Sequence, residues 1–127
     1  KSCIRIPYKK MTKLKKEEVI EVNKLLCQEF KQQGIVINDA NLDFAVDQFN
    51  EKEITVIELC RKVVQGHCFL EGNKRLIFVL YFYLNKIQNS KNPLVNFPIV
   101  GISLVGYTRS MLQQEPWKGW LKLLSEL

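Results

Sequence analysis

Residues 66–87 read GHCFLEGNKRLIFVLYFYLNKI and join a short polar loop to the most apolar run of the chain. From Leu76 to Ile87, apolar residues fall on all sides of a helix rather than along one stripe. A helix that is apolar all round belongs at the centre of a bundle, because other elements must cover each of its faces. The segment therefore predicts a central helix, preceded by a loop of a different composition.

The segments on either side have the periodicity of helices with one buried face. Apolar residues recur three and four positions apart in 14–30, 42–49, 54–64 and 117–124, which is typical of amphipathic helices. A further helix is expected from about 99 to 114, after a connector over 89–98. Expected helix starts and ends lie at Thr12, Gly34, Asn38 or Asp39, Gly66 and Pro116. The fold class predicted is all-α, a bundle of about six helices.

Length and continuity predict one domain. A chain of 127 residues can bury a core of its own, and no repeat or low-complexity stretch divides it. We therefore predict a single domain over 1–127. Residues 1–11 are expected to form an extended arm, with or without a short strand.

Composition excludes several classes of protein. The apolar share of 46% and the charged share of 25% are those of an ordinary globular domain. No apolar run reaches membrane-spanning length and the N-terminus does not resemble a signal peptide, so we expect a cytoplasmic protein with no membrane partner. The four cysteines show no CxxC spacing, which favours reduced, mostly buried thiols over disulfides or structural zinc.

The chain is basic, with a net charge of +6, which would suit a polyanionic partner. Much of the excess lies in lysines between positions 9 and 16, with no aromatic side chains among them to stack on bases. Direct nucleic-acid binding is therefore not expected, and a solvated tail leading into a helix accounts for these lysines.

The loop before the central helix combines the residue types that a phosphate site requires. A glycine at a helix start, Gly72-Asn73, lets backbone amides face an anion. Arg75 can grip phosphate oxygens and Lys74 can add a charge. The carboxylate of Glu71 is a hard ligand of the kind that magnesium prefers. The only histidine, His67, is the natural proton acceptor.

Each of these residues also has a plainer interpretation. A lone histidine such as His67 is often structural, and Lys74 and Arg75 could be ordinary first-turn surface charges. Cations are unfavourable at a helix N-terminus unless an anion binds there, which favours phosphate. Cys68 could be read as a nucleophile beside His67, but sequence neighbours rarely face each other, so we expect it and Phe69 to be packing residues.

The loop 67–75 resembles the signature of the Fic/Doc superfamily, histidine-x-phenylalanine-x-acid-glycine-asparagine-glycine-arginine, at every fixed position except Lys74. Lysine in that place makes the loop similar to the Doc (death-on-curing) branch. The similarity extends over about Leu14 to Leu124. It implies a Fic/Doc-like bundle whose active-site loop lies between two central helices, and transfer of part of ATP, with Mg²⁺, to a protein hydroxyl.

The resemblance also implies a role for each matching residue. His67 would accept the proton of a serine, threonine or tyrosine hydroxyl, and Glu71 would hold magnesium. Arg75 would neutralise charge on the transferred or leaving phosphate, and Phe69 would anchor the loop. The residues expected to bind the phosphate chain are Gly72, Asn73, Lys74 and Arg75.

Two departures from the Fic signature bear on the reaction. Lys74 replaces a glycine, and Phe78 stands where AMP-transferring members have a second arginine. Doc shares both departures, so the resemblance implies a Doc-like protein kinase toxin that acts on a translation factor such as elongation factor Tu and is restrained by an antitoxin. Gly72 keeps a Fic-type AMP transferase open. A catalytically silent binding module is the third alternative, because Phe78 weakens the usual triphosphate site.

A small β flap that pairs with the target is the family's remaining feature. The segment that we assign to it is Phe49, Asn50, Glu51, Lys52, Glu53, Ile54 and Thr55. A plain interhelical loop is an equally good interpretation of the same residues. The family's internal inhibitory motif has no match in the sequence, which predicts either a separate antitoxin or a longer protein.

Overall fold

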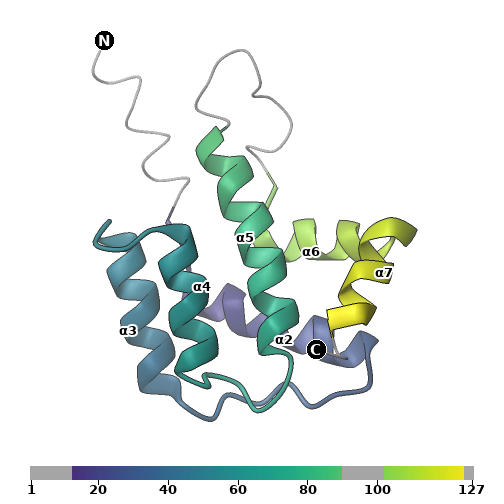
Figure 1. Ribbon diagram of the computed structural model, residues 1–127, viewed down its shortest axis with the longest axis horizontal. Coiled ribbons are helices and arrows are strands. Elements are labelled where there is room, and N and C mark those ends of the chain that lie inside the picture. The colour runs from purple at the N-terminus through teal and green to yellow at the C-terminus, as the bar shows by residue number, and fades with distance from the viewer. Residues whose placement is uncertain (1–12, 90–101, 125–127) are drawn as a thin grey trace.

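Six helices make up the computed structural model, which describes residues 13–89 and 102–124 (Figure 1). Within these ranges no strand forms, and the one isolated β-bridge joins Val36 to Phe69. The predicted all-α bundle is therefore confirmed. The helices are α2 (Lys16–Glu29), α3 (Asp39–Asn50), α4 (Val56–Gln65), α5 (Asn73–Asn89), α6 (Leu104–Leu112) and α7 (Glu115–Leu123).

Helix α5 is the central element, as its composition predicts. It packs against α4, α2 and α6, while α3 covers α4 and α7 packs on α6 (Figure 1). The core lies where these helices meet, because each turns its apolar stripe toward its neighbours in the bundle. Its fully buried side chains include Val22, Leu26, Leu42, Leu59, Val63, Leu76, Val79, Leu80, Leu104 and Leu121.

One face of α5 is not buried, contrary to the prediction that all its sides are covered. Ile77, Phe78 and Phe82 are only half-buried, and Tyr81 is 40% exposed. Helix α7 reaches this face through Trp117, whose ring lies 6.0 Å from that of Phe78. The composition of α5 therefore reflects an open apolar face as well as a core.

Most of the predicted helix boundaries agree with the structure, and the differences have local causes. Gly66 is the C-cap of α4 and Pro116 lies in the first turn of α7, as expected. Helix α2 ends at Glu29, before the expected Gly34. Asn38 precedes α3 but makes no cap hydrogen bond, because its side chain bonds to the loop after α4. Thr12 lies outside the described residues.

The segment assigned to the flap is a plain interhelical loop. Phe49 and Asn50 end α3, and Thr55 is the N-cap of α4, where it forms a capping box with Glu58. Helix α4 has 10 residues and separates this segment from the loop at His67 by roughly 15 Å of helix. Residues 49–55 form no strand, so of the two interpretations the plain interhelical loop describes them, and they lie at the end of α4 opposite the candidate site.

Three further predictions concern other parts of the chain. Cys27, Cys60 and Cys68 are buried, as predicted for structural thiols. The extended arm over 1–11 and nearly all of the connector over 89–98 lie outside the described residues. Within the described ranges, no helix has both the length and the apolarity that crossing a membrane requires.

Candidate active site

The loop begins with a strained turn at the end of α4. Cys68 N–H donates to the carbonyl of Val63 at 3.4 Å, and His67 N–H donates to that of Val64 at 3.1 Å. These bonds form the turn in which helices often end with a left-handed residue, usually glycine. Here that residue is His67, with φ of +48°. A non-glycine residue held in this region costs stability, and such residues cluster at functional sites.

Backbone partners from the α2–α3 connection hold the loop in place. Ile37 N–H donates to the Cys68 carbonyl, and Leu70 N–H donates to the Ile35 carbonyl, both at 2.9 Å. Asn38 Nδ2 donates to the His67 carbonyl at 2.8 Å. Cys68 and Phe69 are buried beneath the loop, so they are packing residues, as predicted. The imidazole of His67 is left exposed above them.

Gly72 turns the chain into α5 at a point where a side chain does not fit. Its φ is +80°, and a Cβ there would lie 2.9 Å from Cys27 Sγ and 3.0 Å from Asn23 Nδ2. Asn23 is fully buried in α2 and donates to the Glu71 carbonyl at 3.1 Å. The loop backbone therefore rests directly on α2, and only glycine permits this approach.

The first turn of α5 presents free backbone amides. Leu76 N–H bonds to the Gly72 carbonyl, whereas the amides of Asn73, Lys74 and Arg75 have no hydrogen-bond acceptor within the described residues. Gly72 has no side chain to cap them. A helix N-terminus with uncapped amides and its partial positive charge is suited to bind an anion.

The side chain of Asn73 braces the loop instead of facing a ligand. Its Oδ1 accepts from Phe69 N–H at 3.2 Å, and its Nδ2 donates to the Phe69 carbonyl at 2.8 Å. Both ends of the amide are thus used to close the loop. The expected contribution of Asn73 to phosphate binding therefore falls to its backbone amide, with the side chain positioning the loop.

Arg75 is a buried cation that lacks an acidic partner among the described residues. Its side chain is 4% exposed in the fold, where Nε donates to the Leu121 carbonyl at 2.7 Å and Nη1 donates to Gln32 Oε1 at 2.6 Å. Its guanidinium stacks on the ring of Phe30 at 3.9 Å. Burial lowers the pKa of Arg75, but the group stays charged. Buried charges are normally paired, so this position favours an anionic ligand.

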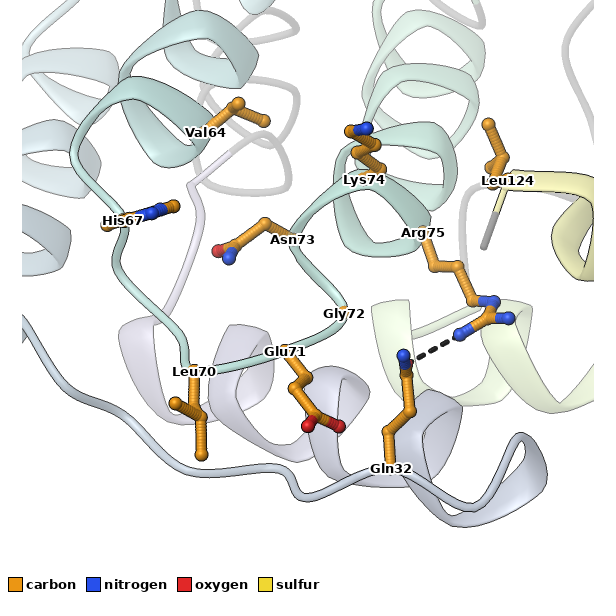
Figure 2. Close-up of a pocket in the computed structure, with 10 residues that line it drawn as sticks. All are labelled: Gln32, Val64, His67, Leu70, Glu71, Gly72, Asn73, Lys74, Arg75 and Leu124. Atoms are coloured by element: carbon orange, nitrogen blue, oxygen red, sulfur yellow. Dashed lines mark hydrogen bonds between the residues drawn. The ribbon is translucent and has the colours of Figure 1, made fainter. Parts of the chain in front are cut away.

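The functional side chains meet at one cavity of about 240 Å³ (Figure 2). Lys74 is exposed at the edge, and Figure 2 shows it on the side of the cavity away from Glu71. Glu71 Oε1 accepts from Gln33 N–H at 3.0 Å, which leaves its second oxygen for a cation. The lining residues are Gln32, Val64, His67, Leu70, Glu71, Gly72, Asn73, Lys74, Arg75 and Leu124. The structure therefore brings together all the loop residues predicted for the site except Phe69, which lies beneath it.

Several supporting residues escaped the sequence analysis. Gln32 and Asn38 lie in the α2–α3 connection, where nothing in the sequence marks them as neighbours of the loop. Asn23 carries a usable signal, because it follows Val22 on the apolar face of α2 and is itself fully buried. A polar residue on a buried face needs a partner, and here the partner is the loop backbone.

Comparison of the chain with protein-family models, curated proteins and solved structures gives no match. The assignment of a function therefore depends on the geometry of this site and on the resemblance of its loop.

Proposed function

We propose that this protein is a nucleotide-dependent transferase that passes the γ-phosphate of ATP to a hydroxyl of a target protein, as a Doc-like kinase does. The observation that carries this proposal is that Arg75 is buried with no acidic partner among the described residues, next to the uncapped amides of α5. Positive charge and amide donors on one cavity are what phosphoryl transfer requires, since its catalysis is mostly positioning and electrostatics.

The proposed phosphoryl transfer gives separate tasks to His67, to the α5 amides with Arg75, and to Glu71. The target oxygen forms a bond to the γ-phosphorus, the bond from that phosphorus to the bridging oxygen breaks, and ADP leaves. His67 receives the proton of the hydroxyl. The α5 amides and Arg75 stabilise the phosphate charge. Glu71 is the residue that would hold magnesium, through one carboxylate together with phosphate oxygens.

The edge that lies beside His67 is the segment Ile35–Ile37, and we assign target docking to it. Its Ile35 carbonyl and Ile37 amide face the loop, so the backbone groups of Val36 point the other way, as in a paired strand. Both isoleucines are 47% exposed. An added target strand could pair there.

The docking edge has a direct test. Ile37→Asp should raise the KM for a protein target about tenfold, because it places a charge on the apolar docking surface, and should leave ATP binding unchanged. Steady-state kinetics with the target and calorimetry with ATP measure the two effects. Phe44→Asp on α3, another exposed apolar position, is the matched control. An unchanged KM in Ile37→Asp would remove this edge from the proposal.

Labelled ATP tests the reaction itself. The protein is incubated in lysate with magnesium and with ATP that carries the label on either the α- or the γ-phosphate. Transfer from the γ-position alone supports the kinase, transfer from the α-position supports an AMP transferase, and no transfer by folded protein supports a binding module. His67→Ala should abolish transfer, and activity retained in that variant would refute the role of His67.

The cellular role follows from the same resemblance. A kinase of the Doc type would be a toxin that modifies a translation factor such as elongation factor Tu and that a separate antitoxin restrains. Expression of the protein should therefore stop growth, and expression of His67→Ala should not. Equal toxicity of both proteins would contradict a catalytic origin.

A further inference from the structure

A second cavity, of about 320 Å³, lies on the open face of α5 next to the polar one. Its walls are apolar and come from two helices, with Ile57 and Cys60 on α4 and Ile77, Phe78 and Tyr81 on α5. We call it the α4–α5 groove. Lys74 and Leu124 line both the polar cavity and this groove, so the two cavities adjoin.

The aromatic wall of the groove is held in place from behind. The ring of Phe78 lies 5.0 Å from that of Phe82 and 6.0 Å from that of Trp117, both in edge-on contacts. The ring of Tyr81 meets the same Phe82 ring at 5.4 Å and 87°. These contacts fix two rings beside the groove before any ligand arrives, which lowers the entropic cost of binding.

We propose that the α4–α5 groove binds the nucleobase of the nucleotide whose phosphates occupy the polar cavity. The proposal rests on the phosphate site of the proposed function and adds where the rest of the nucleotide lies. Lys74, Phe78 and Tyr81 are four and three residues apart, so they line one face of α5 and extend over roughly 10 Å of helix. That reach suits a ribose and base attached to a phosphate held beside Lys74.

The charge and chemistry of the lining favour this occupant. Of the described residues that line the groove, only Lys74 is charged. It lies at the boundary with the phosphate cavity, so a ligand with an anionic end and an apolar, flat end matches both parts. Every nucleobase can stack on aromatic rings. Because the groove offers few hydrogen-bonding side chains beyond Tyr81 and Lys74, ATP and GTP should bind with similar affinity.

Calorimetry with two ligands tests the proposal and separates it from the proposed function. Inorganic tripolyphosphate and ATP are titrated into the protein, each with magnesium. Tripolyphosphate should bind, and ATP should bind about tenfold tighter or more, as stacking of a base on aromatic side chains provides.

Two variants remove the groove without touching the phosphate cavity. Ile57 is 55% exposed, so Ile57→Asp costs the core little and places in the groove a carboxylate that a bound base would have to desolvate. Tyr81→Ala removes an exposed ring. Each should lower the affinity for ATP to that for tripolyphosphate and leave the tripolyphosphate affinity unchanged. Phe44→Asp, at a 61% exposed position on α3, should change neither affinity.

The outcomes are distinct. Equal affinities for ATP and tripolyphosphate in the unmodified protein, or an unchanged ATP affinity in Ile57→Asp, would overturn the nucleobase site and leave the phosphate site standing. Failure of both ligands to bind to folded protein would overturn the phosphate site and the nucleobase site together.

Discussion

His67 occupies a position where glycine normally ends a helix, and it holds a left-handed φ of +48°, as Lys31 and Lys52 do after α2 and α3. This conformation is strained for a residue that carries a Cβ. Replacement by glycine should therefore raise the free energy of unfolding by about 1 kcal/mol, since glycine adopts this conformation without strain. The same change should abolish transfer, because the proton acceptor is gone. Chemical denaturation and the labelled-ATP assay measure the two effects.

His67→Ala is the matched control, because alanine keeps a Cβ at the strained position while losing the imidazole. It should be inactive but no more stable than the unmodified protein. Equal stability of His67→Gly and His67→Ala would show that the backbone is not strained at this position.

A second prediction concerns Gly72, where the loop contacts α2. In Gly72→Ala, the new Cβ meets Cys27 Sγ and Asn23 Nδ2 at a φ of +80°, so we expect a loss of about 2–3 kcal/mol from backbone strain and overpacking. Phosphate binding should weaken as well, because the α5 amides would shift. Denaturation and calorimetry with tripolyphosphate measure these losses.

A double-mutant cycle separates the two causes of that loss. Cys27→Ala removes the sulfur that lies nearest to the new Cβ. Gly72→Ala should therefore lower the free energy of unfolding by about 1 kcal/mol less in the Cys27→Ala background than in the unmodified protein. The part that remains belongs to the backbone conformation. Additive effects of the two substitutions would show that the sulfur is not what excludes a side chain at Gly72.

At the scale of elements, the two ends of α4 differ, because one forms a capping box and the other leads into the candidate site. Thr55 Oγ1 accepts from Glu58 N–H at 3.2 Å, and the Glu58 carboxylate accepts from Thr55 N–H at 2.8 Å. The hydrogen bond to the Thr55 backbone holds the pKa of Glu58 below its usual value. This contribution to stability is therefore present at neutral pH and is lost as the pH falls through that lowered value.

Thr55→Ala removes half of this capping box and should lower the free energy of unfolding by about 1 kcal/mol. Because the box lies at the end of α4 away from His67, kcat and KM for the protein target should not change at a temperature where the variant stays folded. Urea denaturation and steady-state kinetics measure both. A raised KM for the target would restore residues 49–55 as the docking flap.

Local pattern explains which elements the sequence predicted correctly. The end of α4 at Gly66 and the start of α7 near Pro116 depend on neighbouring residues only. The groups of the predicted phosphate loop likewise lie within ten positions of one another in the sequence. The sequence did not predict that residues 35–37 lie beside the loop, because the Val36–Phe69 bridge joins segments more than thirty residues apart. Periodicity contains no information about such contacts.

For the molecule as a whole, the sequence could not predict which faces of a helix are covered by other elements. The run 76–87 is apolar on all sides whether a helix or a ligand covers each face, and the structure leaves the face with Phe78 and Tyr81 open. Likewise, Arg75 is marked by the loop motif as a cation, but its burial against Phe30 and Leu121 depends on how α2 and α7 pack.

Because thiols are buried in the core, the stability of the whole fold should decrease at alkaline pH. Burial raises the pKa of the Cys60 thiol to about 11, from about 9, so in the folded protein this group keeps its proton where an unfolded chain would lose it. Its contribution to stability is complete below about pH 9 and is lost as the pH rises from there toward 11. Burial similarly raises the pKa of Tyr83 to about 12, which extends the loss to higher pH.

The free energy of unfolding should therefore fall from about pH 9 upward in urea titrations with a reductant present. Cys60→Ala lacks the thiol and should show a shallower fall between about pH 9 and 11, with the largest difference in slope near pH 10. Above about pH 11 the two proteins should lose stability at more similar rates, because Tyr83 is present in both. Identical slopes below pH 10 would mean that Cys60 reaches solvent in the folded protein, and that the wall of the α4–α5 groove is looser than its packing indicates.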